Sequence, residues 1–333
     1  MDPVVTALRQ QVKVLVAGVV LMVIAGFAPA VLLWSLGWGQ WVNISVLTGL
    51  ALFLACVGGT GWRTGLIIAA PFALLCGLTD WAAHSALLAA GVLAVAAFLR
   101  GYAAKAGLHD ALTMAVIALG FIAASPPQSD AGVTAPLYVT LISLGTALWA
   151  TLIMYFLRHR LPARKHTGLN PIRVLTFSLI LAFLVGLATW AVVTLNLGHT
   201  GGWIILTIVV VFQPALGAGF KKAWQRAAGT IVGFLIAMAL GAVLPLGPVL
   251  FCVGAIFLIA AFVLLLQNRP YWLYASLLTP AIVLLESSGS PVEALAQQRL
   301  IATLVGVTAT MLVMLAFTPF AEMLVDRSRS RLT

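Results

Sequence analysis

The chain has 333 residues, of which 62% are hydrophobic and only 8% are charged, with a formal net charge of +10. Soluble globular domains carry about 25% charged residues, so a soluble fold of this composition could not cover its own surface. The basic residues lie in short gaps between apolar runs, which indicates membrane orientation and argues against a nucleic-acid partner. The composition predicts an all-α polytopic membrane protein without a soluble domain.

Twelve apolar runs are predicted to cross the bilayer as helices, each crossing requiring about 20 residues. The first six lie at 14–34, 41–57, 64–79, 82–99, 110–125 and 136–157. The second six lie at 172–195, 203–216, 226–244, 247–266, 271–286 and 299–318. The first run contains Ala28-Pro29-Ala30 and could be taken for a secretory signal, but its length and its internal copy favour a membrane span.

The positive-inside rule orients these spans. With the N-terminus inside, all 18 Lys and Arg residues except Arg299 fall on the cytoplasmic side, whereas Asp80, Asp130, Glu286 and Glu293 fall on the outer side. We therefore expect a multi-pass protein of the inner (cytoplasmic) membrane with both the N- and the C-terminus in the cytoplasm.

The chain also contains internal similarity over about half its length. Lys13-Val14-Leu15 precedes the first apolar run as Arg173-Val174-Leu175 precedes the seventh. Six spans separate the copies, so both have one orientation. The sequence predicts two parallel six-helix membrane repeats, at 1–165 and 166–333, the second with a short basic cytoplasmic tail.

A second similarity lies within the C-terminal repeat. Arg226 and Arg299 each begin a segment of the form Arg-x-x-small-Thr-x-x-Gly, and each follows a glutamine. Three spans separate these segments, so they run in opposite directions, which predicts an inverted repeat of three plus three helices. In transporters built from inverted repeats, the substrate site lies near the bilayer midplane between the copies.

The segment from Gly202-Trp203 through Gln213-Pro214 to the helix at 226–233 resembles the fusaric acid resistance and aromatic acid exporter superfamily. That family has a tryptophan-led span ending in Gln-Pro, a small loop and an Arg-x-x-Gly-Thr-x-x-Gly helix. It closes with an Arg-x-x-x-Thr-x-x-Gly helix, which Arg299, Thr303 and Gly306 fit. The resemblance is good over 172–318 and weak over 1–160.

This resemblance implies a FUSC-like membrane transporter domain that handles organic or aromatic acids, generally as an exporter. The plant malate channels are similar to the same segment more distantly. The small residues of the motif, Gly229, Thr230, Gly233, Thr303 and Gly306, are predicted mainly to let helices pack closely.

Arg299 breaks the orientation rule and is predicted to begin a helix, where the helix dipole is positive. An anionic substrate would stabilise this arrangement, and a structural ion pair with Glu286 or Glu293 is the alternative. Arg226 has the matching position at the cytoplasmic end of its span. It is predicted to bind the same anion, and ordinary positive-inside anchoring is the alternative role. Together the two arginines are predicted to form basic gates on opposite faces of one pathway.

Further candidate substrate-binding residues lie at breaks in the helices. Gln213-Pro214 and Thr279-Pro280 end short spans, and broken helices at membrane depth mark transporter sites unless they are simple kinks. Gln213 and Thr279 are therefore candidate neutral contacts. Trp203 is a candidate for stacking on an aromatic substrate, with an interfacial role as the alternative. Glu286 is the candidate proton-coupling group.

The sequence contains no catalytic grouping, metal-ligand spacing or phosphate-binding loop, so we expect neither an enzyme nor a metal or cofactor. The leading hypothesis is a secondary transporter exporting small organic or aromatic anions. A passive organic-anion channel and a non-transporting membrane assembly partner are the alternatives. The expected partners are the lipid bilayer and a small organic anion, and no nucleic acid is expected. A second copy of the chain, forming a homodimer, is a further option.

Overall fold

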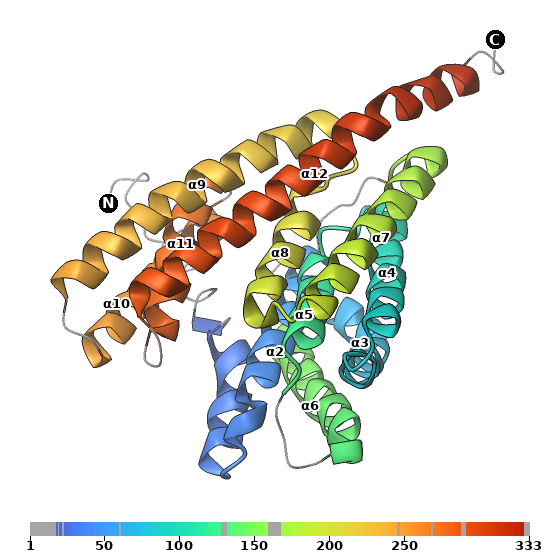
Figure 1. The fold of residues 1–333 in the computed structure, drawn as a ribbon. Coiled ribbons are helices and arrows are strands. Elements are labelled where there is room, and N and C mark those ends of the chain that lie inside the picture. Colours follow the sequence, from blue (N-terminus) through green and yellow to red (C-terminus); the bar gives the residue numbers. More distant parts are fainter. Residues whose placement is uncertain are drawn as a thin grey trace, which may run out of the picture. The chain divides into compact units, whose positions relative to one another are not determined.

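The computed structural model describes residues 18, 20, 21, 23–59, 61–127, 132–158, 168–244, 247–267, 269–287 and 291–329. Within these residues the regular elements are all helices, which confirms the all-α class (Figure 1). Some residues used for orientation lie outside the described residues, namely Arg9, Lys13, Asp130, Arg160, Arg164, Lys165 and Arg331.

Each predicted span overlaps a helix, and residues 14–17, 19 and 22 of the first span lie outside the described residues. In chain order these are Val23–Ser35, α2 (Val42–Gly58), α3 (Trp62–Ala82), α4 (Ala86–Tyr102), α5 (Thr113–Ala124), α6 (Ala135–Phe156), α7 (Pro171–Thr194), α8 (Gly198–Val211), α9 (Leu216–Val243), α10 (Pro248–Leu266), α11 (Tyr271–Glu286) and α12 (Val292–Arg329). Over the described residues, 8 helices are long and apolar enough to cross a membrane. The shorter ones are Val23–Ser35, α5, α8 and α11, so the number of twelve crossings stays a prediction.

The helices are apolar on their outer faces as well as their inner ones. In α3, Ala69 and Ala73 are buried, whereas Ile67 is 73% exposed and Leu74 is 64% exposed. Water would strongly disfavour so much exposed apolar surface, but lipid chains accommodate it. The chain is thus a multi-pass membrane protein, while the identity of the membrane and the orientation of the termini stay predictions.

The helices divide into two compact units. Unit 1 is built on Phe220–Val307 and unit 2 on Ile24–Gly219, so the division falls within α9 and within α12. Helices from both predicted sequence repeats pack together in unit 2, where α4 lies along α7 and α5 along α8. The packing units therefore do not follow the boundary at 165/166, and the division into two sequence repeats remains a prediction.

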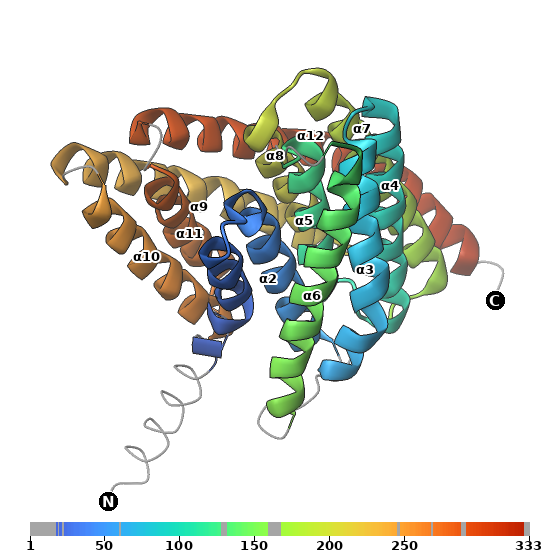
Figure 2. The ribbon, with the colours of Figure 1, turned by 90° about the horizontal axis from the view of Figure 1, so that it is seen from below.

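Close contacts between small and polar residues hold unit 2 together. The hydroxyls of Thr48 in α2 and Thr146 in α6 are 2.7 Å apart and hydrogen-bonded. Figure 2 shows α3 and α6 side by side, and Gly77 of α3 lies directly against Thr140 of α6. Small residues allow such close approach where no hydrophobic effect drives helices together.

Unit 1 has its own apolar core, contributed by α9, α10, α11 and the first turns of α12. The buried cluster consists of Ala237, Leu250, Val283, Leu284, Val292 and Ala296. Helices α10 and α11 lie along each other within this unit. This core packs the C-terminal part of α9 against the beginning of α12. The two buried arginines of the candidate site lie on the same two helices.

Candidate functional site

Unit 1 buries two arginines on neighbouring antiparallel helices. Arg226 of α9 is 1% exposed and Arg299 of α12 is 3% exposed. Near the end of α9, Gly241 lies against Val292, the first residue of α12. Figure 1 shows α9 and the first part of α12 side by side and running in opposite directions. This is the relative direction predicted for the two Arg-Thr-Gly segments, although the wider inverted repeat stays a prediction.

Both arginines lie inside their helices, which corrects the prediction that each begins one. Helix α9 begins at Leu216 and α12 begins at Val292. Arg299 therefore lies about 10 Å along α12, at about 1.5 Å per residue. The dipole effect falls off within the first turn, so the helix N-terminus does not act on Arg299. The apolar-run criterion missed the first turns because polar residues such as Lys221 and Gln297 continue the helix beyond the apolar segment.

The motif residues of each segment lie on a single buried helix face, because spacings of four and three residues follow the helical turn. The buried set is Arg226, Thr230 and Gly233 on α9, and Arg299, Thr303 and Gly306 on α12. On the opposite faces, Ile231 is 44% exposed and Leu304 is 41% exposed. The two motifs thus place chemically equivalent faces in the interior of unit 1.

The glycines of the first motif let α9 approach α11 closely. A Cβ atom at Gly229 would lie 2.5 Å from the carbonyl oxygen of Trp272. A Cβ atom at Gly233 would lie 2.7 Å from Cβ of Thr279 and 2.8 Å from the carbonyl oxygen of Ser276. Both positions leave no room for a side chain, which confirms the packing role predicted for these glycines.

The threonines of the two motifs have a property that the sequence did not predict. The Oγ1 atoms of Thr230 and Thr303 are buried and have no hydrogen-bond partner among the described residues. Other buried threonines, such as Thr207 and Thr279, donate to the carbonyl group four residues back. A buried hydroxyl without a partner is unfavourable unless a water or ligand satisfies it. The packing role assigned to both threonines therefore does not account for their hydroxyls.

Thr230 and Thr303 lie at equal sequence separations from the contact between Gly241 and Val292. Counting back 11 residues from Gly241 gives Thr230, and counting forward 11 from Val292 gives Thr303. In an antiparallel pair these positions lie at the same level along the helix axes. Counted from that contact, both threonine positions fall between those of Arg299 and Arg226. Their repetition four residues after an arginine is the sequence signal that could have identified them.

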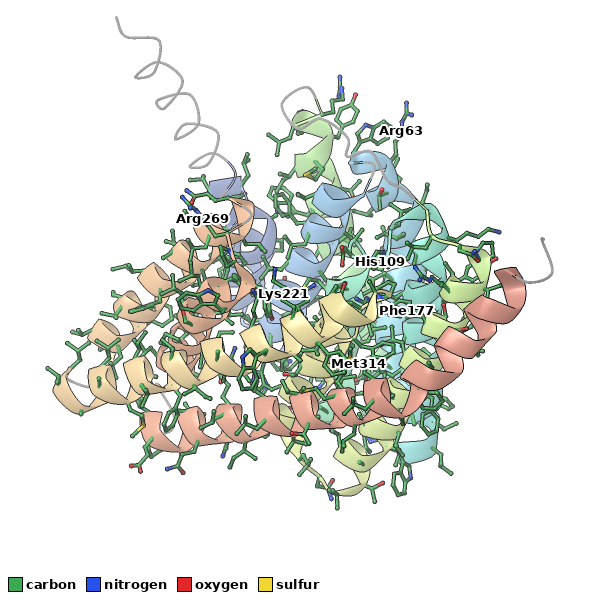
Figure 3. All side chains as sticks on the ribbon, turned by 90° about the horizontal axis from the view of Figure 1, so that it is seen from above. Arg63, His109, Phe177, Lys221, Arg269 and Met314 are labelled. Carbon is green, nitrogen blue, oxygen red and sulfur yellow. The ribbon has the colours of Figure 1, made fainter. Side chains whose placement is uncertain are left out.

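Arg226 is oriented by a tyrosine at the start of α11. Its Nη1 atom donates to the hydroxyl of Tyr271 over 3.2 Å, while its Nε atom has no hydrogen-bond partner among the described residues. The ammonium group of Lys222, one turn before Arg226, lies 5.9 Å from the centre of the Tyr271 ring. Lys221 next to it is exposed (Figure 3). This end of unit 1 is therefore strongly basic.

Arg299 interacts electrostatically with Arg226, Glu286, Tyr274 and Tyr271. The structure thus brings together three residues predicted for the site, Arg226, Arg299 and Glu286. The alternative partner Glu293 is exposed and accepts a hydrogen bond from Gln297. Two guanidinium groups and one carboxylate leave the cluster with net positive charge, which favours an anion in their neighbourhood.

Comparison with known families identifies this part of the chain. Residues 178–313 match the fusaric acid resistance protein-like family. This segment belongs to the fusaric acid resistance protein-like family. The match confirms the resemblance seen in the sequence and indicates a protein of membrane transport or resistance. The curated proteins and the solved structures gave no match.

The fusaric acid resistance protein-like segment contains the three remaining candidate residues. Thr279 is 1% exposed in unit 1, where it contacts α9 at Gly233. Thr279-Pro280 lies inside α11, so the prediction that it ends a span is wrong. Gln213 and Trp203 belong to unit 2. The Nε2 atom of Gln213 donates to the carbonyl oxygen of Val210 over 2.9 Å. Trp203 is 8% exposed and packs edge-on against Phe121. Substrate contacts by these three residues stay predictions.

Proposed function

We propose that the chain is a secondary transporter that exports small organic or aromatic anions across the cytoplasmic membrane. The observation that carries this proposal is the burial of Arg226 and Arg299 on neighbouring antiparallel helices of unit 1. Ionisable residues within membrane spans are unfavourable unless they serve a partner, a cavity or a transported ion. Membership of residues 178–313 in a transport or resistance family supports the same reading.

The chemistry of the two arginines suits a carboxylate ligand. A guanidinium group binds a carboxylate through two parallel N–H···O hydrogen bonds, which are stronger than neutral ones. Helical side chains point toward the N-terminus of their own helix, so the antiparallel arginines reach toward opposite ends of the α9–α12 pair. In the proposed mechanism the anion passes from Arg226 to Arg299 and contacts the hydroxyls of Thr230 and Thr303 between them.

Transport measurements in membrane vesicles test this proposal. Labelled aromatic and dicarboxylic acids are supplied to vesicles containing the wild type, Arg226→Ala or Arg299→Ala. Each substitution should lower the transport rate at least about tenfold, the effect of losing one charge-assisted interaction. Arg63→Ala is the matched control, because Arg63 is exposed at the start of α3. Undiminished transport in both site variants would remove the anion pathway.

The buried arginines and threonines of unit 1 would also serve a passive organic-anion channel. Planar-bilayer recording separates the two functions, because a channel gives unitary currents that persist without a proton gradient, whereas a carrier gives none. A non-transporting assembly partner would show neither currents nor flux, and its arginine variants would behave like the wild type in both assays.

A further inference from the structure

A third arginine is fully buried in unit 2, outside the matched family segment. Arg100 lies in the last turn of α4 and is 0% exposed. Its Nε atom donates to Oγ1 of Thr113 over 3.1 Å. Its Nη1 and Nη2 atoms are buried and have no hydrogen-bond partner among the described residues. The positive-inside rule predicts only that Arg100 lies on the cytoplasmic side.

Asp110 does not hold these two nitrogen atoms by a hydrogen bond. Asp110 interacts electrostatically with Arg100, but the ion pair that it forms is with His109, over 3.8 Å. The side chain of Asp110 is 68% exposed and that of His109 is 17% exposed. A guanidinium group held in an apolar interior needs hydrogen-bonded anionic partners to offset its desolvation. Nη1 and Nη2 of Arg100 can donate hydrogen bonds to such an anionic partner.

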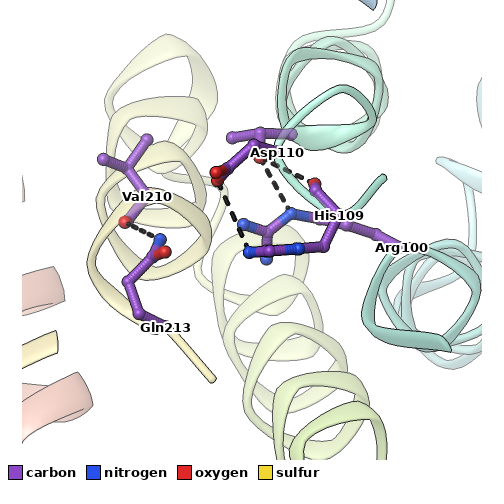
Figure 4. Close-up of polar contacts among 6 residues, drawn as sticks. Arg100, His109, Asp110, Val210 and Gln213 are labelled. Atoms are coloured by element: carbon purple, nitrogen blue, oxygen red, sulfur yellow. Dashed lines mark hydrogen bonds and ion pairs between the residues drawn. The ribbon is translucent and has the colours of Figure 1, made fainter. Parts of the chain in front are cut away.

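Aromatic rings form the other side of this junction. Cζ of Arg100 lies 6.0 Å from the centre of the Phe177 ring in α7. Phe177 stacks on Phe212, with ring centres 5.4 Å apart and an angle of 5° between the planes. Gln213 follows Phe212 just beyond the end of α8, and its amide donates to the carbonyl oxygen of Val210 (Figure 4). Residues from α4, α5, α7 and α8 meet here.

We propose that this Arg100 junction binds the carboxylate group of a small organic anion. Thr113 fixes the Nε side of the guanidinium group, which leaves Nη1 and Nη2 as a pair of donors matched to two carboxylate oxygens. The ligand enters from the side of His109 and Asp110, where the junction meets solvent, and displaces that pair. The negative charge of Asp110 opposes the ligand. This binding does not depend on the chain being a transporter.

Equilibrium binding of labelled benzoate to the purified full-length chain in lipid nanodiscs tests the proposal. The double variant Arg226→Gln/Arg299→Gln removes the arginines of unit 1. Benzoate should still bind to it, and adding Arg100→Gln should weaken that binding at least about tenfold. Arg63→Gln in the same background is the control and should change nothing. Failure of the transport proposal would leave this result intact, because no flux is measured.

Asp110→Asn provides an independent measurement in the wild-type background. Because Asp110 is exposed, its replacement should not disturb folding, and loss of its charge should tighten benzoate binding about threefold or more. Tighter binding supports the Arg100 junction even if Arg100→Gln fails to fold. Unchanged or weaker binding in Asp110→Asn would overturn the proposal. Equal loss of binding in the Arg100→Gln and Arg63→Gln variants would overturn it as well.

Discussion

The Nη1 atom of Arg226 donates a hydrogen bond to the hydroxyl of Tyr271 over 3.2 Å and so joins the buried face of α9 to the first residue of α11. Arg226 is itself buried in unit 1. The tyrosine fixes the direction of the guanidinium group without neutralising its charge. Arg226 is thereby oriented for an anion and remains positive, and this combination is the basis of the proposed transport site.

Removal of the Tyr271 hydroxyl should weaken both the fold and the proposed site. Tyr271→Phe leaves a buried donor of Arg226 without its acceptor, which costs about 1–3 kcal/mol. We expect a lower unfolding temperature and a KM for the transported anion that is raised several-fold. Thermal unfolding in detergent and vesicle transport measure the two effects. Tyr138→Phe, a change on a half-exposed ring of unit 2, should alter neither quantity.

Replacing the motif threonines should separate function from stability. Thr230→Val and Thr303→Val exchange buried hydroxyls that lack a partner among the described residues for methyl groups of similar size. Such a replacement is neutral or stabilising for the fold. Transport should nevertheless fall, by about tenfold in the double variant, if the hydroxyls contact the anion.

Thr189→Val is the matched control for the threonines, because the Thr189 hydroxyl donates to the carbonyl oxygen of Val185 within α7. It should leave the transport rate unchanged. Full transport activity in the Thr230→Val/Thr303→Val variant would show that these hydroxyls are satisfied in another way and would remove them from the pathway.

Adding a methyl group at Gly233 should destabilise unit 1. In Gly233→Ala the new Cβ atom would meet Thr279, Ser276 and Pro280 at 2.7, 2.8 and 3.0 Å. Overpacking of this kind costs about 1–3 kcal/mol, so the unfolding temperature should fall. Gly145→Ala in α6 is the control, because nothing lies within 4 Å of its Cβ position. Alanine favours a helix by about 1 kcal/mol over glycine, so that variant should be as stable as the wild type or more so.

Neutralising Glu286 should change anion binding and the response to a proton gradient. Glu286 interacts electrostatically with Arg299, so Glu286→Gln leaves the arginine with more net positive charge around it. We expect tighter binding of the anion together with a transport rate that no longer responds to an imposed proton gradient. Flux measured with and without the gradient tests this role, with Glu293→Gln as the control.

If the Glu286→Gln variant keeps the gradient response of the wild type, proton coupling must involve another group. Tighter anion binding in this variant would still support a role for Arg299, because the affinity depends only on the charge around the arginine.

The sequence by itself indicated a lipid environment and, over the described residues, where the main helices lie. The low content of charged residues favours lipid, and over the described residues the apolar runs are helical, because a helix satisfies its backbone polar groups within one segment. The Arg-Thr-Gly spacing also fixed which residues share a helix face, since four and three residues make one turn. These properties are local, so they can be read directly along the chain.

Only the tertiary structure decided which faces meet. The contact of Gly241 with Val292 pairs the end of α9 with the beginning of α12, and no local pattern specifies that contact. The structure likewise placed Arg299 inside α12 and buried Arg100, which the orientation rule had treated as an anchor. Burial depends on the packing of segments far apart in sequence, so apolar periodicity cannot distinguish an arginine at the membrane surface from one enclosed among helices.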